Sequence, residues 1–158
     1  MDREELLQQL SEMLLRQNKV LVTAESCTGG GVASACTDLP GSSQWFSHGL
    51  VTYSNESKQC FLNVPPDVLE QFGAVSEETV LAMVAGAVSE GQVALSISGV
   101  AGPDGGTAEK PVGTVWFAWG DVDQQMAHHH LFFGSRTDVR EQAIDYALEG
   151  MIGWLERK

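Results

Sequence analysis

The feature that most restricts the fold is a short apolar run that ends in a glycine-rich turn and passes directly into a helical pattern. Residues 19–24 (KVLVTA) are typical of a buried strand, residues 25–31 (ESCTGGG) of a turn, and residues 32–37 of a helix. A second apolar run, residues 92–98 (QVALSIS), leads into the glycine-rich loop 99–113. Strands that end in such loops are typical of α/β domains, in which ligands bind beyond the carboxyl ends of the strands.

Helical and strand patterns alternate through most of the chain, and two strand patterns follow near its end. The sequence predicts helices over 2–17, 58–62 (capped by Ser54 or Asn55), 65–72, from the cap Ser76 onward and over 137–156, and strands over 48–54, 114–120 and 125–133. The last two strands are expected to pair as a hairpin about residues 121–123. No repeat or linker divides the 158 residues. We therefore expect residues 1–158 to form a single α/β domain, with a mixed, mostly parallel sheet, helices packed on its faces and a late antiparallel hairpin.

The charge of the chain argues against nucleic acid or a membrane surface as its partner. Nine Lys and Arg residues against twenty-one Asp and Glu residues give a formal net charge of −12, and such a field repels phosphate backbones and anionic lipids. One small phosphorylated ligand stays compatible with it, because a few local donors outweigh a screened distant field. The N-terminal pattern lacks the unbroken apolar stretch of a signal peptide, so we expect a cytoplasmic protein.

The first candidate catalytic group is Ser26, where the first predicted strand gives way to a helix. Its hydroxyl could lie beside the backbone N–H groups of Cys27 and Thr28, which would pair a nucleophile with an oxyanion hole. Gly29 and Gly30 would let a substrate approach the backbone closely. The alternative is that Ser26 only caps the helix. Cys27 is a conceivable thiol nucleophile, but nothing near it in the sequence marks it as a thiolate.

Lys58 is the candidate base. It would lie in the first turn of a helix, where the helix dipole and partial burial both lower the pKa of an ammonium group. A neutral lysine can act as the general base for a serine, and Tyr53, on the preceding strand, could orient the amine or relay a proton. The Ser-x-x-Lys spacing of penicillin-binding proteins is absent because residue 55 is Asn. A Ser–Lys pair must therefore form across the fold, between Ser26 and Lys58, unless Lys58 is a solvated surface residue.

Two loops are candidates for substrate binding. The loop 99–113 carries Gly102, Gly105 and Gly106, whose backbone N–H groups could form an anion-binding nest. A plain long turn explains the same residues equally well. In the loop that begins Pro40-Gly41, we expect Ser42 to contribute a further substrate contact.

Arginine is scarce, and two arginines lie together at the start of the last predicted helix. Arg136 and Arg140 are four residues apart, so they share one helix face and could clamp a phosphate together with the helix N-terminus. The alternative is ion pairing with the neighbouring Asp138 or Glu141.

The remaining histidines and cysteines do not predict a metal site. In a strand, His128 and His130 face one side and His129 the other, which leaves at most two ligands without a nearby carboxylate pattern. A solvated edge strand explains them better. Cys36 and Cys60 are expected to pack in or near the core. Three widely spaced cysteines offer no disulfide framework, which is consistent with a reducing compartment.

Seven stretches of the chain resemble the CinA C-terminal domain family. They occur in order between about residue 20 and residue 146, and they are TAESCTGG, PGSSQWF, GLVTYSNESK, GAVSEETV, SISGVAGPDGG, EKPVGTVWFAW and FFGSRTDVR. The resemblance implies a single α/β domain, commonly oligomeric, for which we favour a dimer. Stand-alone members of this family are nicotinamide-nucleotide amidases that need no metal, and we expect no other cofactor.

This resemblance also implies a reaction and roles for residues. The reaction is hydrolysis of the carboxamide of nicotinamide mononucleotide to nicotinate mononucleotide and ammonia, with Ser26 as the nucleophile and Lys58 as its partner. These roles agree with the chemistry of the residues themselves. Three alternatives stay open at this point: a nucleotide-binding or sensing module without turnover, a structural or interaction protein, and an amidase for another pyridine carboxamide.

Overall fold

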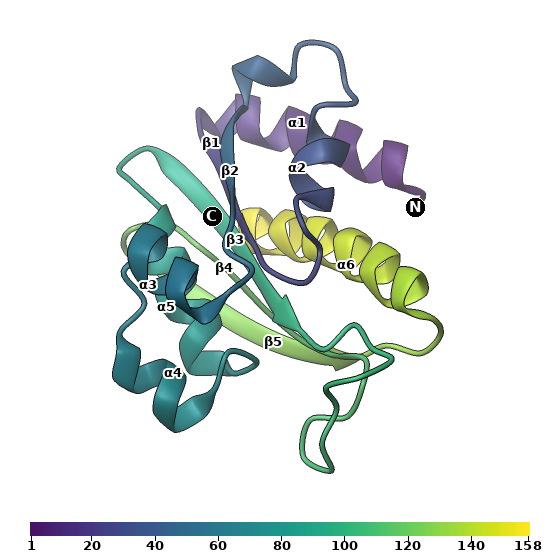
Figure 1. Ribbon diagram of the computed structural model, residues 1–158. Coiled ribbons are helices and arrows are strands. Elements are labelled where there is room, and N and C mark those ends of the chain that lie inside the picture. The colour runs from purple at the N-terminus through teal and green to yellow at the C-terminus, as the bar shows by residue number, and fades with distance from the viewer.

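Six α-helices and five strands follow one another along residues 1–158, all of which the computed structural model describes (Figure 1). The elements are α1 (Arg3–Gln17), β1 (Val20–Glu25), α2 (Gly31–Cys36), the short 3-10 helix η1 (Ser42–Gln44), β2 (Phe46–Val51), α3 (Asn55–Leu62), α4 (Pro66–Phe72), α5 (Glu77–Ala87), β3 (Gln92–Gly99), β4 (Thr114–Gly120), β5 (Gln125–Leu131) and α6 (Arg136–Glu156). Every helix and strand that the sequence predicts is present. No helix is long and apolar enough to cross a membrane.

The strands form one mixed sheet in the order β2-β1-β3-β4-β5. β1 pairs in parallel with β2 and β3, whereas β4 pairs antiparallel with β3 and β5. The predicted α/β class and the late hairpin are therefore confirmed. Because β1, β2 and β3 run in the same direction, their last residues, Glu25, Val51 and Gly99, lie at the same edge of the sheet.

Helices cover both faces of this sheet. In Figure 1, α1, α2 and α6 lie on one face and α3, α4 and α5 on the other. The larger hydrophobic core lies beneath α1 and α6 and includes Leu10, Phe117 and Leu148, all fully buried. A smaller core lies beneath α5, around Val80 and Met83. The two cores hold the edge at which β1, β2 and β3 end in a fixed position.

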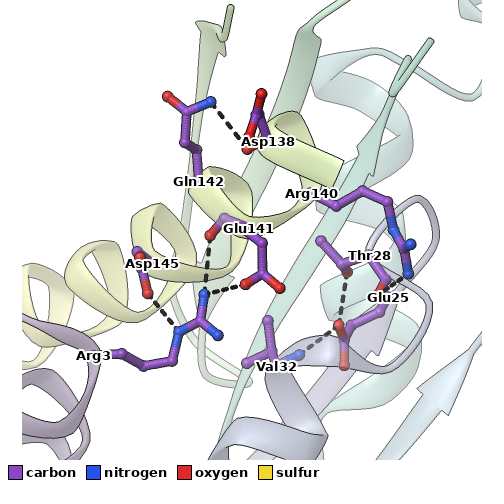
Figure 2. Close-up of polar contacts among 9 residues, drawn as sticks. All are labelled: Arg3, Glu25, Thr28, Val32, Asp138, Arg140, Glu141, Gln142 and Asp145. Carbon is purple, nitrogen blue, oxygen red and sulfur yellow. Dashed lines mark hydrogen bonds and ion pairs between the residues drawn. The ribbon is translucent and has the colours of Figure 1, made fainter. Parts of the chain in front are cut away.

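Specific contacts place the two helices that reach this edge. Ser54 begins α3 by accepting a hydrogen bond from the Ser57 N–H at 3.0 Å, a helix cap worth about 1 kcal/mol. On the other face, Arg3 of α1 binds Glu141 and Asp145 of α6, with nitrogen–oxygen distances of 2.6 and 2.7 Å (Figure 2). These contacts help to orient α3 and α6, which carry the lysine and the arginines singled out by the sequence.

Candidate active site

Ser26 directly follows β1, and its N–H donates to the Ile97 carbonyl at 2.9 Å, which extends the β1–β3 pairing by one residue. The serine is only 7% exposed. Its hydroxyl oxygen lies 3.0 Å from the Nζ atom of Lys58, which comes from α3 on the neighbouring side of the same edge. The structure thus brings together the two residues that the sequence predicts to pair.

Lys58 is buried, with 1% of its surface exposed, and its only hydrogen-bond partners are neutral. Besides Ser26, its Nζ atom contacts the backbone carbonyls of Thr52 at 2.8 Å and Tyr53 at 3.4 Å. It forms no ion pair with a carboxylate. Burial therefore lowers the pKa of the Lys58 ammonium group to about 8. The interpretation of Lys58 as a solvated surface residue is wrong.

A neutral Lys58 fits the same three partners without rearrangement. A neutral amine has two N–H groups, which can donate to the Thr52 and Tyr53 carbonyls, and one lone pair, which can accept the hydroxyl hydrogen of Ser26. At pH 7 about a tenth of a lysine with a pKa near 8 is neutral. The site can therefore hold the protonation state that a general base requires.

Cys27 and Cys36 are unreactive because both are buried. Burial raises the pKa of the Cys27 thiol to about 11 and that of Cys36 to about 12, so both stay thiols at neutral pH and Cys27 is a poor nucleophile. Cys36 is buried, as predicted, but the same prediction for Cys60 is wrong because Cys60 is exposed. The buried residues of α3 are Lys58 and Leu62, one turn apart, and Cys60 projects from a different side of the helix.

The loop after Ser26 is held from below by the carboxylate of Glu25. This buried side chain accepts hydrogen bonds from the Thr28 hydroxyl at 2.7 Å and from the Val32 N–H at 2.9 Å (Figure 2). It accepts a third from the Ala33 N–H at 3.0 Å. The first turn of α2 therefore has its N–H groups capped by Glu25 rather than by Ser26. The hydroxyl of Ser26 is free of the capping role that was its alternative explanation.

Arg140 of α6 binds the same loop through two backbone carbonyls. Its Nε atom donates to the Cys27 carbonyl at 3.1 Å and its Nη2 atom to the Thr28 carbonyl at 3.3 Å. The N–H groups of Cys27 and Thr28 have no acceptor within the protein, whereas the Gly29 N–H donates to the Ser26 carbonyl at 3.0 Å. Both predicted oxyanion-hole donors are thus unoccupied, and the Gly29 N–H closes the turn.

Ser26 and Lys58 open into a cavity of about 230 Å³, somewhat smaller than the volumes of about 300–1,000 Å³ typical of small-molecule sites. The residues that line it are Ser26, Cys27, Tyr53, Lys58, Ala74, Val75, Ser98, Gly99, Ala101 and Arg136. The cavity therefore combines two serine hydroxyls, one amine and one guanidinium with small side chains such as Ala74 and Ala101.

The sequence model of the CinA C-terminal domain matches residues 3–155. The chain belongs to the CinA C-terminal domain family. The protein named nicotinamide-nucleotide amidohydrolase PncC from Pseudomonas putida is 52% identical over 145 residues, which cover 90% of this chain and 91% of that protein. The protein of the same name from Escherichia coli K12 is 48% identical over 148 residues, 92% and 90% of the two chains.

Solved structures of the CinA superfamily have the same fold. A protein from Klebsiella pneumoniae matches with a TM-score of 0.95 and 34% identity over the full length of both chains. A competence/damage-inducible protein from Agrobacterium tumefaciens matches with a TM-score of 0.93 and 39% identity, covering 99% of this chain and 96% of that one. The fold described above is therefore the fold of this superfamily.

Arg136 and Tyr53 lie at the mouth of the cavity in this CinA domain. Arg136 donates to the Gly102 carbonyl at 2.6 Å and to the Tyr53 hydroxyl at 3.2 Å. The Tyr53 side chain is 62% exposed, and it is the backbone carbonyl of Tyr53, not its phenol, that contacts Lys58. The phenol is thus placed to orient Arg136 rather than to relay a proton from the amine.

Neither arginine forms the ion pair considered as its alternative. Asp138 accepts hydrogen bonds at the Ser135 cap, which lower the pKa of its carboxyl group, and Glu141 binds Arg3. The two arginines nevertheless make different contacts, because Arg136 lines the cavity whereas Arg140 binds the carbonyls of the loop after Ser26. The expectation that both clamp one phosphate is not supported for Arg140.

Several other expected binding residues lie outside the cavity. Ser42 belongs to η1, which precedes β2, so it lies at the amino-terminal edge of the sheet, opposite the edge that holds Ser26. Gly105 and Gly106 lie on an exposed part of the loop 99–113. Thr28, Gly29 and Gly30 adjoin the site without lining it, and Gly102 contributes only the carbonyl that binds Arg136.

Ser98 is the polar residue of the cavity that the sequence does not single out. It is 2% exposed, and its hydroxyl forms no hydrogen bond with the protein. Two residues earlier, the Ser96 hydroxyl donates to the Val80 carbonyl at 2.7 Å. The register of the parallel pairing sets Glu25 beside Ile97, and therefore Ser26 beside Ser98. Only that register, which a single sequence does not supply, could have drawn attention to Ser98.

The three histidines lie on the predicted edge strand, β5. Each lies near an aromatic ring: His128 is 5.7 Å from the ring of Trp119, His129 is 4.6 Å from that of Trp116, and His130 is 5.2 Å from that of Tyr146. No three His, Cys, Asp or Glu side chains are grouped so that they could hold a metal ion. The three histidines are exposed on this edge strand, as the sequence predicts.

Proposed function

We propose that the protein hydrolyses the carboxamide of nicotinamide mononucleotide to nicotinate mononucleotide and ammonia, with Ser26 as the nucleophile and Lys58 as the general base. The observation that carries this proposal is the 3.0 Å contact between Lys58 Nζ and Ser26 Oγ at the end of a cavity. The names of the two relatives at 52% and 48% identity support the amide and the nucleotide as substrate features.

The first half of the reaction forms an acyl-enzyme. Neutral Lys58 accepts the hydroxyl proton of Ser26 as the Ser26 Oγ atom attacks the amide carbon. The carbonyl oxygen becomes an oxyanion, which the free N–H groups of Cys27 and Thr28 can stabilise. The Lys58 ammonium then returns the proton to the amide nitrogen, the C–N bond breaks, and ammonia leaves. The product is an ester between the pyridine carbonyl and Ser26.

The second half releases the acid. A water molecule takes the place of ammonia and gives a proton to neutral Lys58 as its oxygen attacks the ester carbon. The same N–H groups stabilise the second oxyanion. Lys58 then protonates the departing Ser26 oxygen, which restores the enzyme and yields the carboxylate. Each step uses only groups of the chain, the substrate and water.

Two further residues suit the remainder of the substrate. Arg136 is the only arginine that lines the cavity, and its place at the mouth suits a ribose phosphate that extends outward from a ring bound inside. The Ser98 hydroxyl, which has no partner in the protein and belongs to a residue that lines the cavity, can donate to or accept from the carboxamide. The carboxamide and the phosphate lie at opposite ends of nicotinamide mononucleotide. The carboxamide can therefore lie inside the cavity while the phosphate lies at its mouth.

The test is ammonia release from nicotinamide mononucleotide by the wild-type protein and by Ser26→Ala and Lys58→Ala. Both variants should lose about a thousandfold or more in kcat, the loss typical of removing a nucleophile or its base. Ser43→Ala and Lys19→Ala, which change the same residue types at the opposite edge of the sheet, serve as matched controls and should keep full activity. Turnover that survives in Ser26→Ala would contradict the mechanism.

The same assay separates the alternatives. Binding of the nucleotide by the wild-type protein without any ammonia release would identify a sensing module. Equal or faster turnover of free nicotinamide would identify an amidase for another pyridine carboxamide. The expected dimer and the cytoplasmic location stay predictions, to be measured by light scattering and by cell fractionation.

A further inference from the structure

One guanidinium group holds two consecutive carbonyls of the loop that follows Ser26. Arg140 donates from Nε to the Cys27 carbonyl and from Nη2 to the Thr28 carbonyl, at 3.1 and 3.3 Å. It has no carboxylate partner, since the ion pairs of the chain involve only Arg3 and Lys158 as cations. The rigid fork of donors on an arginine suits such a two-point contact.

The Cys27 carbonyl determines where the N–H group of the next residue points. In a trans peptide the C=O and N–H bonds point in opposite directions. The Cys27 carbonyl and the Thr28 N–H belong to one peptide, so a carbonyl drawn toward Arg140 turns the Thr28 N–H away from it. The Ser26 carbonyl, held by the Gly29 N–H at 3.0 Å, fixes the Cys27 N–H in the same way. Both free donors therefore have directions fixed before a substrate arrives.

The charge of Arg140 adds to this effect. A hydrogen bond from a cation polarises the carbonyl that accepts it, and the N–H of the same peptide becomes a stronger donor. The loop also approaches the guanidinium closely, because a Cβ atom on Gly29 would lie 3.3 Å from Arg140 Nη2. Beneath the loop, the Glu25 carboxylate binds the Thr28 hydroxyl (Figure 2). Thr28 is thus fixed at its carbonyl by α6 and by the Gly31 N–H at 3.0 Å, and at its side chain by β1.

We infer that Arg140 is a positioning residue, which aims the Thr28 N–H at the oxyanion of the reacting amide and does not bind the substrate phosphate. This inference rests on the proposed amidase function and adds to it the group that orders the oxyanion hole. It assigns different roles to the two arginines of α6. Arg136 would bind the phosphate end of the substrate, and Arg140 would act on the reacting carbonyl through the backbone.

The test compares two substrates that differ only in the phosphate, nicotinamide mononucleotide and nicotinamide riboside. Arg140→Ala should lower kcat by about 100-fold, the loss typical of one oxyanion donor, by the same factor on both substrates and with KM nearly unchanged. Arg140→Lys, which keeps the charge but not the fork, should recover only part of kcat. The pH at which the rate is half-maximal should stay at the wild-type value, since Arg140 does not contact Lys58.

Arg136→Ala is the matched control, one turn away on the same helix, and should impair only the phosphorylated substrate. A loss in Arg140→Ala that is confined to nicotinamide mononucleotide, or that lies in KM, would overturn the inference in favour of phosphate binding. If the riboside is turned over too slowly, the separation of kcat from KM on the nucleotide decides the question. If Arg140→Ala does not fold, as judged by circular dichroism, Arg140→Lys and Arg140→Gln carry the same comparison.

Failure of the proposed function is recognised separately. In that case the wild-type protein would release no ammonia from either substrate, or Ser26→Ala would remain active. An active wild type with an inactive Ser26→Ala, together with an Arg140→Ala of normal kcat, would refute the role of Arg140 alone.

Discussion

Lys58 Nζ and Ser26 Oγ lie 3.0 Å apart although the two residues are 32 positions apart in the chain. The contact exists because β1 and β2 are parallel, so that the residues after both strands emerge at one edge and α3 begins there. A lysine that is buried for structural reasons normally meets a carboxylate, which favours its charged form. Lys58 meets only two carbonyls and a hydroxyl, and the pair is therefore suited to moving a proton.

The first prediction concerns the pH dependence of turnover. The reactive form of Lys58 is the neutral amine, and burial lowers the pKa of this group to about 8. The rate on nicotinamide mononucleotide should therefore rise about tenfold per pH unit below pH 8 and level off above it. Initial rates of ammonia release between pH 6 and 9.5 measure this profile. A rate that is flat, or that falls as the pH rises through this range, would show that Lys58 is not the base.

The second prediction is that Lys58 costs the protein stability at neutral pH. Its pKa is about 8 in the folded protein and 10.5 when exposed, a difference of 2.5 units and hence a cost of about 3 kcal/mol in the free energy of unfolding below pH 8. Between pH 8 and 10.5 the unfolded chain binds more protons, so stability should rise and the cost should disappear. Lys58→Met, with a side chain of similar length, removes the cost but leaves the Thr52 carbonyl without its donor and the Tyr53 carbonyl with only the Ser26 hydroxyl, at 3.5 Å.

The expected result for Lys58→Met is an inactive protein that is more stable at pH 7, by about 1–2 kcal/mol after that loss of hydrogen bonds. Urea unfolding at pH 7 and pH 10 measures it, and the gain should shrink at pH 10. Lys19→Met, at the amino-terminal end of β1, is the control and should show no such pH-dependent gain. A variant less stable than the wild type at both pH values would mean that Lys58 is a structural residue.

The sequence predicted the contact between Ser26 and Lys58 but only part of its surroundings. A strand that turns into a helix at Ser26, and a lysine near a helix start, are local patterns, and local patterns predict local geometry well. The spacing of Arg136 and Arg140 correctly placed them on one helix, but spacing does not say what lies opposite a side chain. Arg140 faces the Cys27 carbonyl because of how α6 packs over the sheet, which is a property of the whole fold.

The other residues that the sequence placed wrongly or missed also depend on how the whole fold packs. Ser42 lies in a polar, glycine-containing loop of the kind that binds ligands, but the loop precedes β2 and so lies at the wrong edge of the sheet. Cys60 is apolar enough for the core, and only the phase of α3, fixed by buried Lys58 and Leu62, leaves it exposed. Ser98 needed the register between β1 and β3. Each of these properties depends on which elements become neighbours.

The third prediction concerns two serines on one face of β3. The Ser98 hydroxyl faces the cavity without a protein partner, whereas the Ser96 hydroxyl donates to the Val80 carbonyl at 2.7 Å. Ser98→Ala should lower kcat/KM by about tenfold, the value of one hydrogen bond to the substrate, and leave the melting temperature unchanged. Ser96→Ala should lower the free energy of unfolding by about 1 kcal/mol and leave the kinetics unchanged. Kinetic assays and thermal unfolding of both variants test the pair, and an exchange of the two results would refute the assignment of Ser98 to the substrate.

The fourth prediction concerns the phosphate end of the substrate. Arg136 gives one N–H to the Gly102 carbonyl and another to the Tyr53 hydroxyl, and both partners are neutral, so a dianionic phosphate can compete for the guanidinium. Hydrogen bonds to a charged group contribute about 1.5–3 kcal/mol, so Arg136→Ala should raise KM for nicotinamide mononucleotide by about 10- to 100-fold. Nicotinamide riboside, which lacks the phosphate, should be turned over as by the wild type. High salt should weaken binding of the nucleotide to the wild type and have little effect on the variant. Equal losses on the nucleotide and the riboside would mean that Arg136 shapes the cavity through Gly102 and Tyr53 and does not bind the phosphate.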